Sequence, residues 1–156
     1  MIEIVRAEER HVPDIGKLWL EYMHFHQDID PIFTTVDDAV PIFEENHLLP
    51  VMKSEDSLVL VALDEGRVVG YSFSEIRQTS KVLKRNRHGY VHDMAVTASY
   101  RRRGIGEKMF DELLNWFYSK NIDRVELDIT TKNQVASSFW KKHGFTNYTR
   151  RLYRQI

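Results

Sequence analysis

The apolar residues along the chain follow two spacings, which predict two kinds of element. Short runs that alternate or are unbroken are typical of β-strands. They occur at residues 2–6, 57–63, 67–77, 90–96 and 124–129, and a last run begins at Phe145. Asp64-Glu65-Gly66, between the second and third runs, predicts a hairpin turn.

The second spacing, with apolar residues three or four apart, predicts helices. It covers residues 12–25, about 36–46, 105–117 and 133–143. The second of these patterns is weak because Pro41 and Pro50 disturb it. The predicted order is one strand, two helices, three strands, a helix, a strand, a helix and one or two final strands. No linker or repeat divides the chain, so we expect one domain over residues 1–156.

The turn before the helix at 105–117 has the composition of an anion site. Gly104 and Gly106 carry no Cβ atom, so a ligand can approach the backbone closely. Ile105 and Glu107 belong to a first helical turn that presents unpaired N–H groups and the positive end of the helix dipole. Three arginines precede the glycines: Arg101, Arg102 and Arg103. This combination predicts binding of a phosphorylated cofactor.

Two familiar phosphate-binding motifs do not fit the turn. A dinucleotide-binding fingerprint needs a third glycine where Met109 stands. A Walker loop needs Gly-Lys-Ser/Thr, whereas the chain has Gly106-Glu107-Lys108. From the turn alone, the remaining alternative is a tight loop with solvated arginines.

Two segments resemble signatures of the GNAT superfamily, the acyl-CoA-dependent N-acetyltransferases. Arg101-x-x-Gly104-x-Gly106 resembles the pyrophosphate-binding signature Arg/Gln-x-x-Gly-x-Gly/Ala. Residues 133–145 are similar to the segment Asn-x-x-Ala-x-x-Leu/Phe-Tyr-x-x-x-Gly-Phe, with Trp140 in place of the tyrosine. The resemblance implies an α/β (α+β) fold with a mixed, mostly antiparallel sheet of six to seven strands flanked by about four helices.

The resemblance also implies acetyl-CoA as the cofactor and CoA as a product. The strands at 90–96 and 124–129 would be parallel and splay apart, with the acyl-CoA arm between them. A backbone bulge would aim one N–H at the thioester oxygen. From the residues alone, Asn133 suits the N-cap of the last helix and Gly144 its left-handed C-terminal cap. The resemblance implies that Asn133 also touches the pantetheine arm. The residues implied in cofactor binding are Met94, Ala95, Val96, Arg101, Arg102, Arg103, Gly104, Ile105, Gly106, Glu107, Asn133, Ala136 and Trp140.

Transfer of an acetyl group to an amine requires removal of a proton, because a free alkylamine has a pKa near 10. His92 is the first choice for the base, since it titrates in a useful range and would share one strand face with Tyr90 and Met94. Asp93 should face the opposite way unless a bulge redirects it. Glu75 on the adjacent strand is the second choice. The alternative for His92 is a half-buried histidine with a structural role only.

Trp140 bears on which residue, if any, would protonate the departing CoA thiolate. In many members of the superfamily a tyrosine at that place protonates the departing thiolate, which an indole cannot do. Trp140 would then wall the cofactor tunnel while CoA leaves as a thiolate, or Tyr148 would serve as the acid. A third alternative is a relative that binds acyl-CoA as a sensor without turnover.

The acceptor is an amine of unidentified type: a small molecule, a protein N-terminus or a lysine. In the GNAT fold the first two helices and their loop usually roof the acceptor site. Here that stretch carries Glu21, Tyr22, Asp28 and Asp30, and carboxylates near an aromatic suit a cationic polyamine or amino sugar. A solvated helix end is the alternative. His24 and His26 are two residues apart on a helix and point apart, so no metal site is predicted.

Composition and net charge exclude several other classes of function. The net charge is −1, which gives no general attraction to nucleic acid or anionic lipid. No cysteine is present, so disulfides and thiolate chemistry are excluded. No apolar run is long enough to span a bilayer, and the N-terminus lacks a basic-then-apolar leader. We therefore expect a cytoplasmic protein without membrane contact.

A basic loop between two predicted strands leaves one further function open. It contains Lys81, Lys84, Arg85, Arg87 and His88. Together with the arginines at 101–103, it would form an RNA-facing patch, although the aromatic platforms of single-strand binders are missing. A solvated loop or contact with the 3′-phosphate of CoA is the preferred alternative.

The C-terminal run from Phe145 allows one long strand or two very short ones. The GNAT fold usually closes with two. The chain would then lack its last strand, or a partner subunit would complete the exposed edge. The second case predicts a homodimer.

Overall fold

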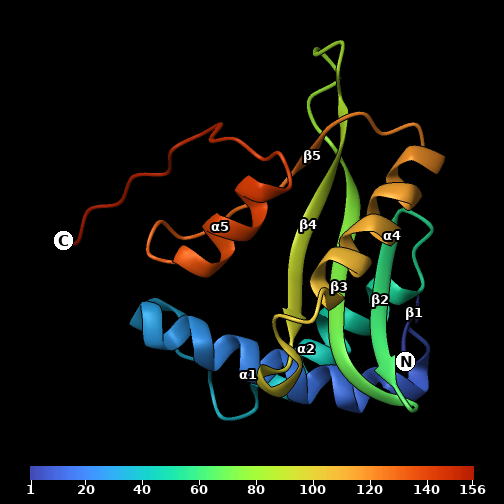
Figure 1. Cartoon of the computed structure of the whole chain (residues 1–156). Helices are drawn as coiled ribbons and strands as arrows, with labels where there is room; N and C mark the ends of the chain where they lie inside the picture. The colour runs from blue at the N-terminus through green and yellow to red at the C-terminus, as the bar shows by residue number, and fades with distance from the viewer.

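The computed structural model describes all residues from Met1 to Ile156 and contains one sheet of five strands (Figure 1). The strands lie in the sheet in chain order, and only the last pair is parallel. They are β1 (Ile2–Arg6), β2 (Ser57–Asp64), β3 (Arg67–Gln78), β4 (Arg87–Val96) and β5 (Val125–Glu126).

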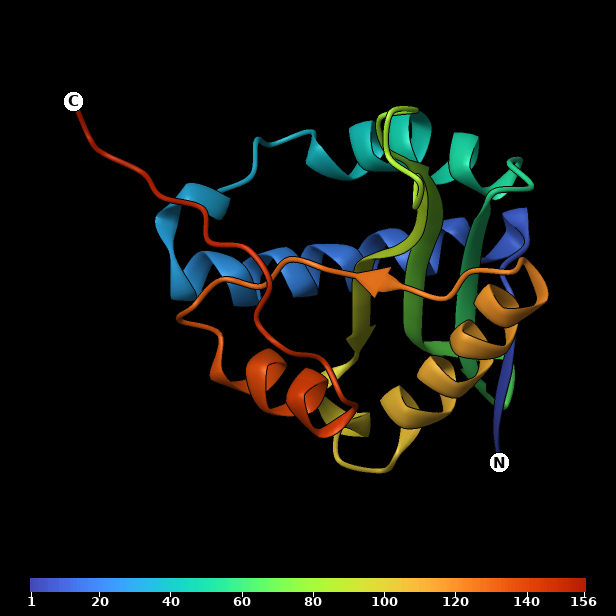
Figure 2. The ribbon, with the colours of Figure 1, turned by 90° about the horizontal axis from the view of Figure 1, so that it is seen from above.

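Helices cover both faces of this sheet, as the view from above shows (Figure 2). One face carries α1 (Val12–Ile29), α2 (Ala39–Phe43) and α3 (Leu49–Met52), and the other carries α4 (Ile105–Ser119) and α5 (Gln134–Lys142). Three 3₁₀ turns complete the elements: η1 (Glu9–His11), η2 (Pro31–Phe33) and η4 (Ala98–Tyr100). No helix is both long and apolar enough to cross a bilayer.

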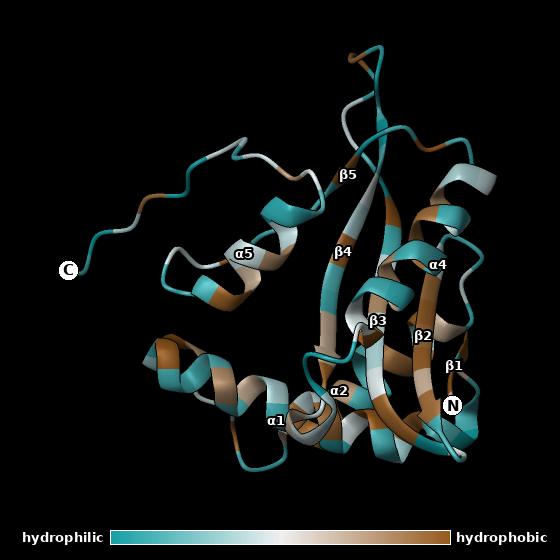
Figure 3. Cartoon of the chain, viewed as in Figure 1, coloured by the Kyte–Doolittle hydropathy of each residue, from teal (hydrophilic) through white to brown (hydrophobic).

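The continuous apolar run of β2 is explained by these two layers. Val59 and Val61 pack against α1, whereas Leu58 and Leu60 pack against α4 and its neighbours. A strand that is buried on both faces has no need for polar positions. Figure 3 accordingly shows β2 as the most uniformly apolar strand of the sheet.

The second helical region differs from its prediction. It was expected at about residues 36–46, but helix runs from Ala39 to Met52, because a π turn at Glu44–Leu48 joins α2 to α3. Pro50 lies in the first turn of α3. A proline lacks an N–H and cannot continue a regular α-helical ladder, and a π turn is one way for a helix to absorb that break.

The sheet has five strands, so the prediction of six to seven was wrong. Residues from Phe145 to the end form no strand and extend away from the sheet (Figure 1). The strand expected at 124–129 is also short, because β5 pairs with β4 at two positions only. A strand needs a partner along its length, and a run of suitable residues does not supply one.

Several local predictions are confirmed. The turn between β2 and β3 has positive φ at Glu65 (48°) and Gly66 (81°), as a two-residue hairpin of type I′ requires. Asn133 caps α5 by accepting a hydrogen bond from the Ala136 amide at 3.0 Å. Gly144 has a φ of 87° and ends the same helix, where the amide of Phe145 donates to the carbonyl of Trp140 at 3.0 Å.

Candidate active site

The glycine turn before α4 has the backbone of an anion cradle. Gly104 has a φ of 76°, and a Cβ atom there would meet no heavy atom within 4 Å. Glycine therefore suits this position because of its backbone conformation and not because of crowding. No side chain caps the first turn of α4, so its N–H groups are free for a ligand.

The side chains of this first turn make contacts within the protein. Ile105 is 2% exposed in the core. Glu107 pairs with Lys142 on α5 and lies 4.0 Å from His143 Nε2. Gly106 faces the Phe139 ring, where a Cβ would come within 3.3 Å. The turn therefore offers backbone N–H groups to a ligand, while its side chains hold α4 against α5.

The three arginines differ in what they do. Arg101 donates from Nε to the Val96 carbonyl at 3.0 Å, and its Nη2 lies 3.7 Å from Glu21 Oε1. The Arg103 guanidinium lies over the Tyr100 ring at 4.8 Å. Arg102 is exposed and makes no ion pair. Arg102 and Arg103 are therefore the cations that remain available to an anion at this turn.

β4 and β5 pair only at their beginnings. The parallel ladder consists of Gly89 with Val125 and Tyr90 with Glu126. From Val91 onward, β4 has no partner strand on this side, and Met94, Ala95 and Val96 lie along the unpaired edge. α5 lies on the side of this unpaired edge (Figure 1), with Asn133 buried at its N-terminus and Ala136 and Trp140 packed against the core around Phe110.

A β-bulge interrupts β4 at His92. Phe73 pairs with Asp93 and the next residue, Ser74, pairs with Val91, which leaves His92 as the extra residue. His92 and Asp93 consequently point to the same face, toward α1. Met94 packs on the opposite face against α4, so the prediction that it shares a face with His92 was wrong. The bulge also brings in Asp93, which regular alternation would have placed on the α4 face.

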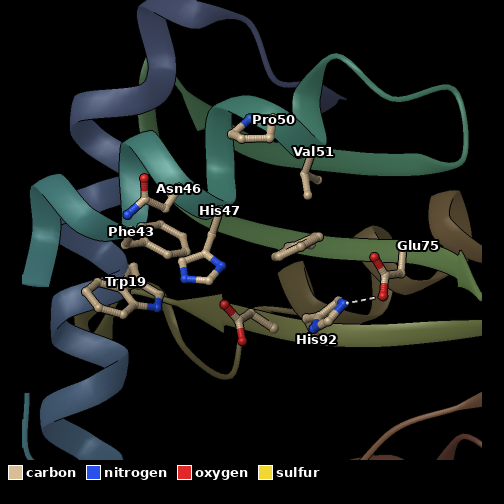
Figure 4. Close-up of a pocket in the computed structure, with 10 residues that line it drawn as sticks. Trp19, Phe43, Asn46, His47, Pro50, Val51, Glu75 and His92 are labelled. Atoms are coloured by element: carbon tan, nitrogen blue, oxygen red, sulfur yellow. Dashed lines mark ion pairs between the residues drawn. The ribbon is translucent and has the colours of Figure 1, made fainter.

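These side chains open into a pocket of about 400 Å³ between the sheet and the first helices (Figure 4). β3 and β4 form its floor, and α1 and the helical stretch from α2 to α3 form its wall. The lining residues are Trp19, Phe43, Asn46, His47, Pro50, Val51, Phe73, Glu75, His92 and Asp93.

His92 is held in this pocket by Glu75, Phe73 and Arg77, whose Nη2 lies 3.5 Å from the His92 Nε2. Its Nε2 lies 2.9 Å from Glu75 Oε1, and its ring stacks on Phe73 with centroids 4.3 Å apart (Figure 4). Because Nε2 is engaged, Nδ1 is the nitrogen that remains without a protein partner. The structure therefore joins the two predicted bases, His92 and Glu75, into one hydrogen-bonded pair.

Glu75 is shared with an arginine. The same Oε1 accepts a hydrogen bond from Arg77 Nε at 2.7 Å, and the Arg77 guanidinium lies 3.4 Å above the Tyr90 ring. Burial alone would raise the pKa of Glu75, but the hydrogen bonds from Arg77 and His92 outweigh it and lower that pKa. Glu75 is therefore a stable carboxylate that can fix the orientation of His92.

Asp93 is a carboxylate without a cationic partner. Its Oδ2 accepts a hydrogen bond from the Tyr71 hydroxyl at 3.0 Å, and it pairs with no Lys or Arg. Burial raises its pKa, although Tyr71 opposes the shift. Burial, followed by the nearby Asp93 charge, raises the pKa of Tyr22 as well. The two phenols thus remain neutral around an acidic group that faces the pocket.

Tyr148 does not line this pocket. Its side chain is 72% exposed and lies against Arg124, whose guanidinium is 4.4 Å from the ring centroid. It lines a second hollow beside the β3–β4 hairpin. The structure therefore offers no route by which Tyr148 reaches the neighbourhood of His92.

The basic loop lies at the opposite end of β4 from the glycine turn. β4 has ten residues, so about 30 Å of strand separates the two. The 3′-phosphate of CoA is joined to the pyrophosphate through a single ribose, so a pyrophosphate bound at the turn would leave the 3′-phosphate far from the loop. This geometry argues against the predicted contact between the loop and the 3′-phosphate.

Two of the polar residues predicted near the acceptor, Glu21 and Asp30, have structural roles. Glu21 accepts hydrogen bonds from Thr97 Oγ1 and the Ala98 amide, both at 2.9 Å. Asp30 caps η2 and pairs with Lys132. The pocket wall comes instead from two aromatic residues that we did not single out for it, Trp19 and Phe43, which stack 4.3 Å apart. They are distant in sequence, and only their helical spacing marked them as buried.

Comparisons with known proteins agree on one family. The model of the acetyltransferase (GNAT) family matches residues 18–145. An N-alpha-acetyltransferase of Sulfurisphaera tokodaii is 30% identical over an alignment of 130 residues. The alignment covers 76% of this chain and 74% of that protein. The chain therefore belongs to the GNAT family and is an acyltransferase.

Solved structures show the same fold at lower identity. A mutant of the BH1408 protein from Bacillus halodurans has a TM-score of 0.87 at 19% identity, with 99% of each chain covered. A predicted acetyltransferase from Clostridium acetobutylicum, solved with acetyl-CoA, has a TM-score of 0.80 at 16% identity and covers 99% of this chain and 96% of its own.

Proposed function

We propose that the protein transfers the acetyl group of acetyl-CoA to a primary amine. The observation that carries this proposal is the bulge at His92. It places His92 and Asp93 in the pocket, while the edge of the same strand stays unpaired from Val91 to its end, just before the glycine turn. Donor and acceptor can therefore meet at one point on β4.

The donor site is built mainly from backbone. The free N–H groups of residues 104–107 bind the pyrophosphate, and Arg102 and Arg103 add charge. Met94, Ala95 and Val96 offer their unpaired edge to the pantetheine arm, as another strand would. Asn133 adds its side-chain amide, since the cap uses only its oxygen. Bound acetyl-CoA supplies an activated acetyl thioester beside the bulge.

His92 removes the proton from the acceptor. A primary amine is protonated at neutral pH, so it attacks only after Nδ1 has accepted a proton. Glu75 holds the opposite nitrogen and stabilises the imidazolium that forms. A backbone N–H on the unpaired edge of β4 donates to the charge that develops on the acetyl oxygen. The new C–N bond forms as the C–S bond breaks, by direct attack with both substrates bound.

Neither Trp140 nor Tyr148 can protonate the departing sulfur. Trp140 is 8% exposed, packs edge-on against Phe110 with ring centroids 5.5 Å apart, and has no acidic proton to give. Tyr148 lies in another hollow. We therefore propose that CoA leaves as a thiolate and that Trp140 acts as a wall of the tunnel.

Thiol release from acetyl-CoA, measured against a panel of primary amines, tests this function. Initial rates at varied concentrations of both substrates should give intersecting double-reciprocal lines, as a ternary complex requires. Parallel lines would indicate an acetyl-enzyme and contradict direct attack. Tight acetyl-CoA binding without thiol release on any amine would instead support a sensor.

A further inference from the structure

The second hollow beside the β3–β4 hairpin has the opposite charge to the pocket around His92. It has a volume of about 340 Å³, and its lining includes Lys84, Arg85, Arg87 and Arg124. Glu126 is its one carboxylate. The pocket around His92 is lined by the carboxylates of Glu75, which pairs with Arg77, and Asp93, which pairs with no lysine or arginine. An acidic pocket and a basic hollow thus lie on one molecule of nearly neutral net charge.

Part of the positive charge in the second hollow is not neutralised. Arg124 pairs with Glu126 at 2.9 Å, and Arg85 pairs with Asp123 at 3.5 Å. Lys84 and Arg87 have no carboxylate within 4.0 Å, and both are exposed. Two cations are therefore free to bind an anion.

The two hollows follow each other along one face of the sheet. Glu75 of β3 lines the first, and Thr79, which follows the end of β3 and donates its amide to the Asn86 carbonyl at 2.8 Å, lines the second. On the neighbouring strand His92 and His88 repeat this arrangement. Four residues of strand correspond to about 13 Å. A ligand that lies along this face reaches both hollows.

Arg77 and Tyr90 occupy the part of the sheet face between the two hollows. Arg77 pairs with Glu75 and stacks on Tyr90 at 3.4 Å, so its side chain lies along the sheet. Arg77 is also opposite His88 in the strand register. No helix covers this part of the face, because α3 ends at Met52 and its neighbours line only the first pocket. An extended ligand can therefore pass from one hollow to the other.

We propose that the acceptor is the N-terminal amine of a polypeptide with an acidic side chain at its third or fourth residue. This inference rests on the proposed function. The terminal ammonium enters the pocket of Glu75 and Asp93 and loses its proton to His92. An extended chain advances about 3.5 Å per residue, so the third and fourth residues lie about 7 and 10 Å from the first, and an acidic side chain together with the long side chains of Lys84 and Arg87 spans the rest of the distance.

Other acceptors fit the two hollows less well. A small diamine would occupy the acidic pocket and leave the basic hollow unused. RNA would use the basic hollow, but Tyr148 is the one aromatic ring there, and single-strand binders stack successive bases on several. An acidic peptide is the ligand whose charges match both ends of the face.

A set of peptides with free N-termini, identical except for Glu, Gln or Lys at the third and fourth residues, tests the proposal. The wild-type enzyme should acetylate the Glu peptide with a kcat/KM about tenfold above that of the Gln peptide, with the Lys peptide lowest. In the double variant Lys84→Glu/Arg87→Glu, the order of the kcat/KM values should reverse, with the Lys peptide highest and the Glu peptide lowest. Arg10→Glu/Lys17→Glu, a charge reversal of equal size outside both hollows, should keep the wild-type order.

The possible results distinguish this inference from the proposed acetyl transfer on which it rests. Equal kcat/KM values for the three peptides, or turnover of small monoamines without any turnover of peptides, would overturn the peptide inference and leave acetyl transfer standing. Absence of thiol release with every amine would overturn both. Binding of an RNA oligonucleotide that is lost in Lys84→Glu/Arg87→Glu, together with equal peptide rates, would assign the basic hollow to nucleic acid and overturn the inference.

Discussion

His92 Nε2 lies 2.9 Å from Glu75 Oε1, across two adjacent antiparallel strands. The same oxygen accepts a hydrogen bond from Arg77 at 2.7 Å. Glu75 is therefore fixed by a cation on its own strand and can in turn fix the imidazole. This leaves Nδ1 of His92 free on a ring that is 27% exposed at the pocket, as a proton acceptor must be.

Replacing His92 by alanine should slow acetyl transfer chiefly at neutral pH. General-base catalysis contributes about 10²- to 10⁴-fold, and it is needed only while the acceptor amine is protonated. The deficit of His92→Ala in kcat/KM should therefore shrink as the pH approaches the amine pKa near 10. A pH–rate profile of the same shape as the wild type would exclude His92 as the base.

Glu75→Gln should change the acid stability of the protein. Hydrogen bonds from Arg77 and His92 outweigh burial and lower the pKa of Glu75 below its usual 4.5. The folded state then holds this proton less tightly than the unfolded state, so the stabilisation is complete above that value and disappears as the pH falls through the lower folded pKa. Urea unfolding should show that Glu75→Gln loses stability at neutral pH and little in acid.

Asp93→Asn should show the opposite dependence on pH. Burial raises the pKa of Asp93 above its usual 3.8, so ionisation of this group costs folding free energy as the pH rises through and beyond that value. The amide keeps an acceptor for Tyr71 and removes the charge. The variant should unfold at higher urea than the wild type at neutral pH, with the gap closing in acid, while its acetyl transfer falls. A gap that does not depend on pH would contradict the assigned charge.

The parts of the site that sequence predicts are those defined by neighbouring residues. Gly104 takes its left-handed conformation at the start of α4, and Asn133 and Gly144 cap the two ends of α5. Each of these features depends on a few residues in a row, because a helix end must satisfy its own backbone groups locally. The anion cradle could therefore be located before its surroundings were known.

The parts that sequence does not predict depend on contacts between distant segments. The bulge at His92 is defined by the register of β4 against β3, and this register decides that Asp93 faces the pocket while Met94 does not. The stacking of Trp19 on Phe43 likewise joins two separate helices. The missing last strand is a third case, since a β-like run forms no strand without a partner edge.

Gly89→Ala should destabilise the protein through a clash with α4. A Cβ atom at Gly89 would lie 2.6 Å from Phe117 Cζ, and Phe117 is 1% exposed and cannot move away. Overpacking of this kind costs about 1–3 kcal/mol. In urea unfolding, Gly89→Ala/Phe117→Leu should lose less stability than the two single changes added together, because leucine leaves room for the new methyl. Simple additivity would contradict the contact.

Gly104→Glu should abolish acetyl-CoA binding, and Gly66 provides the matched control. Both glycines have left-handed backbones, with φ of 76° and 81°, and neither has a heavy atom within 4 Å of its missing Cβ. The conformational cost of a side chain, about 1–2 kcal/mol, is therefore the same at the two positions. Only Gly104 lies at the free N–H groups of α4, where a carboxylate would occupy and repel the pyrophosphate site. Calorimetry should give a Kd for CoA at least about 100-fold weaker in Gly104→Glu, a change of about 2.7 kcal/mol, and an unchanged Kd in Gly66→Glu. Equal affinities in the two variants would place the phosphate site elsewhere.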